Sequence, residues 1–295
     1  MSKVGFVGTG AIAEAICTGL CTGTAAPDSV ILSPRSAERS ARLAAAHDSC
    51  TIATDNQSVV DAADIIFVCV LPAQLDDVLS SLTFRPEQTI VSLVSTSTLS
   101  GVASCSKLPA SQVFKMICLP PVAMHRGTCL LVPKGNATIK TMCDSLGGTV
   151  ECDSEDALRA LMVTTCLMGP FYNILKTQRN WLARQGVPAA DASYFIGRTY
   201  LGLAQDAEQK CTDEGHYDHL VEENTPGGMN EQAIANLTRL GCYAAYDTVQ
   251  DALLERLSGA GDGHRESIDV ATTLSSLSTE ALEQELERRK SCEKL

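Results

Sequence analysis

Two glycines near the start of the chain are spaced to let the backbone hold a phosphate group. The apolar run 4–7 leads into Gly8 and Gly10, and residues from Ala11 onward continue at helical spacing. Gly8 can adopt the dihedral angles of a tight turn, and Gly10 has no Cβ that would keep a pyrophosphate off the backbone. The unpaired N–H groups and the positive dipole end of the following helix favour an anion. This pattern predicts a dinucleotide site with contacts from Gly8, Thr9, Gly10, Ala11 and Ile12.

A second group of anion-binding side chains follows the next apolar run. Residues 30–33 are rich in β-formers, and Ser33, Arg35 and Ser36 surround Pro34 before a helix-forming segment. Dinucleotide folds that prefer NAD place an acidic residue here for the ribose 2′-hydroxyl, whereas those that bind NADP supply an Arg. Two hydroxyls and a guanidinium, without an acid, favour a 2′-phosphate and therefore NADP. The alternative is that the serines only cap the helix.

The third group is a turn in the second half of the chain. Thr225 and Pro226 precede Gly227 and Gly228, and a helix-forming segment follows directly. Consecutive N–H groups in such a turn can point the same way and bind an anion. The turn is therefore a candidate carboxylate site, and the alternative is an ordinary connection between helices.

The segments that must position the first two groups alternate between strands and helices. We expect strands at 30–33, 51–53, 65–70, 89–93, 114–117, 128–132 and near Val150, with helices opening at Asn56 and Pro72 among them. The continuous apolar run 65–70 is typical of a central parallel strand, and the alternation is typical of an α/β fold. We therefore predict a Rossmann-type dinucleotide-binding domain over residues 1–153.

From Glu155 onward, long helical patterns replace the strands. They cover 157–184 with an interruption at Gly169 and Pro170, then 191–212 and 231–258. This change predicts an all-α domain over residues 154–258, with apolar faces too large for one small domain to bury. Such faces predict an interface between subunits, as a homodimer or higher homo-oligomer. Residues 259–295 are expected to form a flexible linker and a charged tail, to which no function is assigned.

Net charge, apolar runs and cysteine spacing limit the kinds of partner and ligand that we expect. The net charge of −12 argues against nucleic acid or an anionic membrane surface. The first strand begins by Lys3, which leaves no room for a signal peptide, and no apolar run approaches about 18 residues, so we expect a cytoplasmic protein without a membrane segment. The 13 cysteines are scattered, and Cys17 and Cys21, one helical turn apart, lack the further ligands of a zinc pattern. We expect core packing for both, and no metal.

The two glycine motifs together resemble those of the pyrroline-5-carboxylate reductase family. The first match runs from Gly8 to Ile16 and the second from Thr225 to Asn230, so the resemblance covers about residues 2–258. It implies an NAD(P)H cofactor, a helical dimerisation domain and an active site shared between subunits. Matches at Asn56, Pro72, Gln74, Gly127 and at Gly169-Pro170 support it. The full set of expected cofactor contacts then also includes Asn56, Val70, Leu71, Pro72 and Ser95.

The chain departs from the family pattern at the rim where an open α/β sheet holds its ligand. Leu71 stands where the family usually has Lys, and Ser95-Thr96-Ser97 replaces a small-residue segment. Leu119-Pro120-Pro121 replaces Asn-Thr-Pro, and Asn230 replaces the last Thr of the C-terminal signature. The cofactor is therefore better supported than the substrate.

The resemblance implies reduction of a cyclic imine carboxylate by NADPH. Backbone N–H groups of Thr225, Gly227, Gly228 and Met229 would hold the substrate carboxylate, and the catalytic residue Asn230 would contact the ring nitrogen. One alternative is a related reductase of another imine or of a β-hydroxy acid, for which Lys176 and Asn180 have the right spacing, although a solvated helix face is the favoured explanation of that pair. The other alternative is a catalytically inactive NADP-binding protein, which the altered rim suggests.

Overall fold

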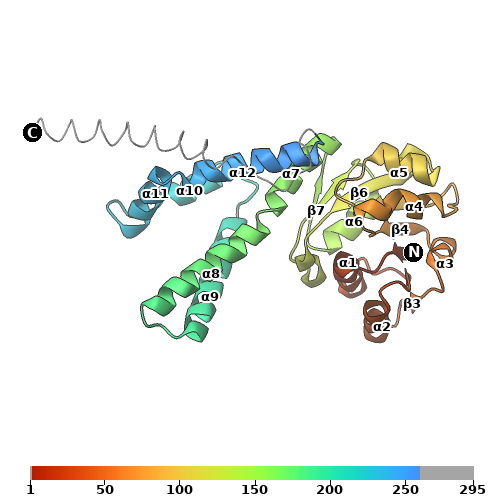
Figure 1. The fold of residues 1–295 in the computed structure, drawn as a ribbon, viewed down its shortest axis with the longest axis horizontal. Coiled ribbons are helices and arrows are strands. Elements are labelled where there is room, and N and C mark those ends of the chain that lie inside the picture. The colour runs from red at the N-terminus through yellow and green to blue at the C-terminus, as the bar shows by residue number, and fades with distance from the viewer. Residues whose placement is uncertain (1, 260–295) are drawn as a thin grey trace, which may run out of the picture. The chain divides into compact units, whose positions relative to one another are not determined.

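The computed structural model describes residues 2–259. The chain divides into two units, the first ending at Thr165 and the second beginning at Cys166. The first unit contains every strand found in the described residues, and the second contains helices (Figure 1).

Eight strands form one sheet in the order β3-β2-β1-β4-β5-β6-β7-β8. Neighbouring strands are parallel except for β7, which runs antiparallel to β6. The strands are β1 (Lys3–Val7), β2 (Ser29–Leu32), β3 (Cys50–Ile52), β4 (Ile65–Val68), β5 (Thr89–Ser92), β6 (Val113–Ile117), β7 (Cys129–Val132) and β8 (Thr149–Glu151).

The chain order reverses between β1 and β4. From β1 the sheet grows through β2 to β3 on one side, and from β4 through β5 to β6 on the other, with Val4 paired to Ile65 in the central register. Parallel strands on both sides of such a reversal leave a crevice at their carboxyl ends. The predicted α/β fold with a Rossmann-type first domain is confirmed.

Helices cover both faces of the sheet, and each face has its own apolar core. Residues from α1, α2 and α6 form one core with the sheet, and residues from α3, α4 and α5 form the other. Phe6 and Phe67 stack between β1 and β4 with ring centroids 5.1 Å apart. The elements are α1 (Ala11–Thr22), α2 (Ala37–Ala46), α3 (Asn56–Ala62), the 3-10 helix η1 (Pro72–Gln74), α4 (Leu75–Ser80), α5 (Leu99–Ser106), η2 (Ala110–Gln112), η3 (Pro120–Met124), α6 (Ala137–Ser145) and α7 (Glu155–Thr165).

The second unit is built from helices with large apolar side chains left exposed. Helices α8 and α9 lie side by side (Figure 1), and Phe171 packs edge-on against Tyr200 with centroids 5.7 Å apart. Within the described chain, no residue of α8, α11 or α12 is buried. The helices are α8 (Met168–Arg184), α9 (Ala189–Glu208), α10 (His216–Glu222), α11 (Met229–Arg239) and α12 (Cys242–Leu257).

The helical pattern breaks at different points from those expected. The interruption predicted at Gly169 and Pro170 lies at 166–167, because Pro170 sits in the first turn of α8, where its missing N–H breaks no helical bond. The single helix expected over 231–258 is wrong. Gly241 takes a left-handed conformation (φ 71°) and separates α11 from α12.

The predicted domain boundary at residue 153 and the division after Thr165 differ by one helix. Helix α7 belongs to the first unit because Leu158, Met162 and Val163 are buried there, and its Glu155 accepts a hydrogen bond from the Leu99 N–H at 3.1 Å. The expected tail lies at 259–295, and all of it except residue 259 is outside the described residues.

One stretch meets the length and composition of a membrane span, contrary to the sequence expectation. Residues Glu155–Arg184 contain an 18-residue window with a mean hydropathy of 1.2, of which 17% is buried. Threonines interrupt its apolar residues. A search of the sequence for uninterrupted apolar runs therefore does not find this stretch. A single stretch of this kind is weak evidence for a membrane, and α7 and α8 are separated at 166–167.

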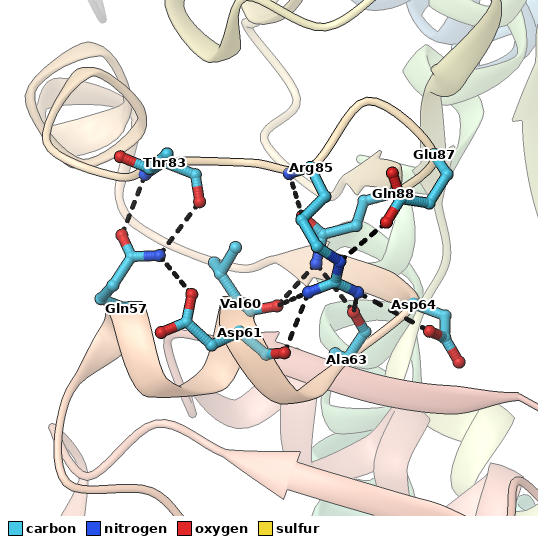
Figure 2. Close-up of polar contacts among 9 residues, drawn as sticks. All are labelled: Gln57, Val60, Asp61, Ala63, Asp64, Thr83, Arg85, Glu87 and Gln88. Atoms are coloured by element: carbon cyan, nitrogen blue, oxygen red, sulfur yellow. Dashed lines mark hydrogen bonds and ion pairs between the residues drawn. The ribbon is translucent and has the colours of Figure 1, made fainter.

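A polar cluster fastens the end of α3 to the loop that enters β5. Figure 2 shows Arg85 and Gln88 reaching the last carbonyls of this helix. The Gln88 side chain is fully buried and donates to the carbonyls of Val60 and Ala63 at 2.6 and 2.8 Å, and Arg85 donates to those of Ala63 and Asp61 at 2.9 Å each. Carbonyls at a helix end have no partner within the helix, so these side chains supply the missing donors.

Candidate cofactor and substrate sites

A pocket opens at the reversal of strand order, where β1 and β4 end. The turn after β1 forms its floor, and Gly8 adopts a φ of +91° that side chains disfavour. A Cβ on Gly8 would come within 2.8 Å of the Cys69 carbonyl oxygen, which follows β4. The tight junction therefore needs glycine. The lining residues are Gly8, Thr9, Gly10, Arg35, Ser36, Cys69, Val70, Leu71 and Gln74.

The residues at the head of α1 fit a dinucleotide pyrophosphate. Gly10 is the N-cap, in an extended conformation, and no side chain caps the helix. A Cβ built on Gly10 would have nothing within 4 Å, so space lies directly in front of the helix. First-turn N–H groups, left without a capping side chain, are donors that a phosphate can use.

The loop after β2 closes one side of the pocket. Arg35 is exposed, and its Nη1 donates to Gln74 Oε1 at 2.9 Å. Among the described residues, none of those lining the pocket is acidic. Arg35 and Ser36 therefore line the same acid-free pocket as the glycine turn.

Ser33 is placed differently from the other two residues of its group. It is fully buried and does not line the pocket. Its carbonyl accepts hydrogen bonds from Thr9 Oγ1 at 3.0 Å and Ser40 Oγ at 2.8 Å, and its hydroxyl accepts a long one from the Arg35 N–H at 3.4 Å. Ser33 thus orders the loop that carries Arg35, with Thr9 joining this loop to the glycine turn.

The remaining predicted cofactor contacts spread around the same edge. Val70 and Leu71 line the pocket, whereas Pro72 lines a neighbouring hollow together with Thr96 and Ser97. Of the others, Ala11 and Ile12 form the first turn of α1, Asn56 opens α3 outside both hollows, and Ser95 lies after β5.

Lys115 on β6 is a rim residue that the sequence analysis missed. Its ammonium is buried and donates to the carbonyls of Ser95 at 2.8 Å and Ser97 at 2.6 Å. Burial lowers the pKa of Lys115, and the nearby Glu155 carboxylate opposes that shift. A lone lysine in an otherwise apolar strand was the signal that could have revealed it.

The Pro-Gly-Gly turn of the second unit holds a carboxylate of the chain itself. The Gly227 N–H donates to Glu231 Oε2 at 2.6 Å, and the Gly228 N–H donates to the Thr225 carbonyl at 2.9 Å. Gly228 caps α11 without a side-chain hydrogen bond. Thr225, Gly228, Met229 and Asn230 line a hollow beside the turn.

Comparisons with known proteins agree with this layout. The model of the family "NADP oxidoreductase coenzyme F420-dependent" matches residues 3–96. Pyrroline-5-carboxylate reductase of Corynebacterium melassecola is 25% identical over 88% of this chain and 99% of its own length. Over most of its length the chain is therefore similar to pyrroline-5-carboxylate reductases.

Solved structures of pyrroline-5-carboxylate reductases have a similar fold. A 1-pyrroline-5-carboxylate reductase from Streptococcus pyogenes aligns with a TM-score of 0.73 at 22% identity, over 88% of this chain and 98% of its own. A Plasmodium falciparum pyrroline carboxylate reductase, described with NADP bound, aligns with a TM-score of 0.73 at 14% identity over the same shares. These structures support the fold, and the relatives in sequence support an oxidoreductase that uses a nicotinamide dinucleotide.

The alternative pair on α8 offers little support for another chemistry. Lys176 and Asn180 are both exposed, and Asn180 Oδ1 accepts hydrogen bonds from the neighbouring Arg179 guanidinium at 2.9 and 3.2 Å. This arrangement agrees with a solvated helix face.

Proposed function

We propose that the protein is an NADPH-dependent reductase of a cyclic imine carboxylate, with pyrroline-5-carboxylate as the substrate and proline as the product. The observation that carries the proposal is the pairing of two anion sites of different kinds. One is an acid-free dinucleotide pocket with Arg35 at its side, and the other is a turn whose N–H binds a carboxylate. The similarity to pyrroline-5-carboxylate reductases supports the reaction class.

Residues of the first unit would hold the cofactor. N–H groups at the head of α1 would bind the pyrophosphate, and Arg35 with Ser36 would bind the 2′-phosphate. Arg35 would leave Gln74, or share its donors between Gln74 and the phosphate, since a guanidinium has five N–H groups. Val70 and Leu71 would pack against the nucleotide, and the bound NADPH would supply a hydride to the carbon of the imine.

The turn in the second unit would hold the substrate by its carboxylate. The Gly227 N–H already donates to a carboxylate, that of Glu231, and the substrate carboxylate would replace it. The other donors would be the N–H groups of Thr225, Gly228 and Met229 at the uncapped start of α11.

Asn230 would position the imine. A cyclic imine is basic enough to arrive protonated, so its ring N–H is a donor and the protein need not supply a strong acid. The Asn230 side-chain oxygen can accept that hydrogen bond, where a hydroxyl serves in the family pattern. Its work is orientation, because hydride transfer requires the reacting carbon to be held against the cofactor.

A homo-oligomer formed through the second-unit helices is part of this proposal. Large apolar side chains on α9, such as Tyr194 at 74% and Phe195 at 65% exposure, are not covered by the described part of the chain. A second copy would bury them, and the shared active site implied by the family would then be complete. A cytoplasmic location stays a prediction.

A direct assay tests the proposal. The purified full chain is mixed with NADPH and pyrroline-5-carboxylate, and oxidation of NADPH is followed by its absorbance, with proline measured as the product. Rapid oxidation with matching proline formation is the expected result. Oxidation only with other imines or β-keto acids would assign a related reductase instead. Binding of NADPH without oxidation by any of these compounds would indicate an inactive binding protein.

A further inference from the structure

Three cysteine thiols meet on the face of the sheet that α1 covers. Cys17 and Cys21 lie one turn apart in the second half of α1, and Cys50 is the first residue of β3. The Cys50 sulfur lies 3.6 Å from that of Cys17 and 3.7 Å from that of Cys21, and all three sulfurs are within 4.8 Å of one another. Sequence spacing hides this group, because the fold brings Cys50 to the helix from the next βα unit.

The spacing of the sulfurs suits ligands that share one ion. A tetrahedral zinc site with Zn–S bonds of about 2.3 Å separates its sulfurs by about 3.8 Å. A disulfide would require a sulfur separation of about 2.05 Å, well below either separation measured here. The three thiols could therefore bind zinc with little movement, whereas a disulfide would require one side chain to shift.

The group has a closed side and an open side. Cys17 is fully buried and Cys50 is 5% exposed, whereas Cys21 is half-buried and its sulfur lies 3.7 Å from Ser49 Oγ. Cys21 and Ser49 are both half-buried, so this side of the group is the more accessible to an ion and to a fourth ligand from solvent. Zinc sites with three protein ligands keep such an open position.

We propose that Cys17, Cys21 and Cys50 bind one zinc ion as thiolates, with the fourth position open toward Ser49 and solvent. The ion would fasten the second half of α1 to β3, which pairs with β2 and not with β1. The first half of the same helix carries the pyrophosphate end of the cofactor pocket. The zinc ion would thus fix the position of the helix whose first turn lies at the dinucleotide pocket. The proposal holds whichever substrate is reduced.

Another buried cysteine in the same unit provides a matched control. Cys143 on α6 is fully buried, its sulfur lies 3.3 Å from Met116 Sδ, and it is not part of the three-thiol group. Cys143→Ala therefore removes a buried thiol from the same core without touching the proposed ligands.

The test is a zinc titration of the full chain, reduced and freed of metal, in competition with a chromophoric chelator. We expect one equivalent to bind. Cys17→Ala, Cys50→Ala and the milder Cys21→Ser should each weaken binding by more than about 100-fold, since losing a residue that only hydrogen-bonds to a metal ligand already costs about 10- to 100-fold. Cys143→Ala should bind zinc as the parent does, and zinc should raise the Tm of the parent and of Cys143→Ala only.

Cobalt gives a second readout that needs no variant. Co²⁺ added to the parent chain should produce intense near-ultraviolet charge-transfer bands from three thiolate ligands, and zinc should bleach them. If the bands do not appear, or if zinc binding is equal in the parent and in the Cys17→Ala/Cys50→Ala double variant, the proposal is wrong. The cobalt spectrum decides the matter even if the cysteine variants fold poorly.

Discussion

At the scale of single residues, Arg35 tests which dinucleotide the protein prefers. Arg35 lies beside an opening whose lining has no carboxylate, as far as the described residues show. Arg35→Asp removes a cation from the expected 2′-phosphate position and adds a repelling charge. The KM for NADPH should rise by about tenfold or more, and that for NADH should fall or stay the same. Steady-state assays with each cofactor measure the ratio.

Gln74→Ala is the companion variant for Arg35. It removes the group that holds the guanidinium at 2.9 Å but leaves the charge in place. NADPH should remain preferred, with a smaller change in KM. An unchanged cofactor ratio in Arg35→Asp would contradict the assignment of the 2′-phosphate to this loop.

Asn230 tests the substrate end of the site. Asn230→Ala removes the proposed acceptor for the ring N–H, so kcat should fall about tenfold or more, while the dissociation constant for NADPH stays nearly unchanged. Fluorescence titration with NADPH and initial-rate kinetics separate the two effects.

Glu231→Gln is the contrasting variant. It weakens the side chain that competes with the substrate carboxylate for the Gly227 N–H, so it should lower the substrate KM. A normal kcat in Asn230→Ala would remove this residue from the active site.

Sequence patterns predicted the pocket residues whose positions depend on their neighbours in the sequence. They missed the residues whose positions depend on contacts with distant parts of the chain. Gly8, Gly10 and Arg35 line the pocket because a turn and a loop place them there. Ser33 belongs to the same loop, yet it is buried and bonded to Thr9, which spacing along the chain cannot reveal. Lys115 reaches the rim only through the pairing of β6 with β5.

At the scale of elements, strands were easier to predict than helix breaks. A buried parallel strand is a continuous apolar run, so β1, β4 and β5 were all evident. The break between α7 and α8 and the one between α11 and α12 depend on local backbone conformation, such as the left-handed Gly241. Helix α10 also escaped prediction, since seven residues are too few to show a period.

The junction of α3 and β5 should depend on Gln88. Gln88→Leu replaces the amide with an apolar side chain of similar size, and it removes the donors to two carbonyls and the acceptor for the Arg85 N–H at 2.7 Å. The free energy of unfolding should fall by about 1–3 kcal/mol, since buried carbonyls lose partners. Urea unfolding followed by circular dichroism measures this change.

Glu87→Gln is the control for this junction. Glu87 pairs with Arg85 at 2.9 Å on the exposed side of the same loop, so its loss should leave the unfolding midpoint nearly unchanged. Equal effects of the two substitutions would show that the charge on the loop, rather than the buried amide, fastens α3.

At the scale of the whole molecule, the two units differ in how far they bury their apolar side chains. The first buries its apolar residues on both faces of a sheet, so it contains its own cores. The second leaves Tyr194, Phe195 and Leu203 of α9 between 59% and 74% exposed. Apolar surface of this extent favours association, which is what the long apolar helical patterns of the sequence predict.

Phe195→Asp should therefore change the oligomeric state. A carboxylate on a face that a second copy would bury is costly to desolvate, so the variant should form smaller species than the parent in analytical ultracentrifugation. Its kcat should fall with assembly, because the proposed active site is shared between subunits. Ser100→Asp adds the same charge at the exposed start of α5, where an acid is favourable, and should assemble normally. If Phe195→Asp sediments as the parent does and keeps its activity, the subunit interface lies on other helices and the α9 face is left exposed in the assembly.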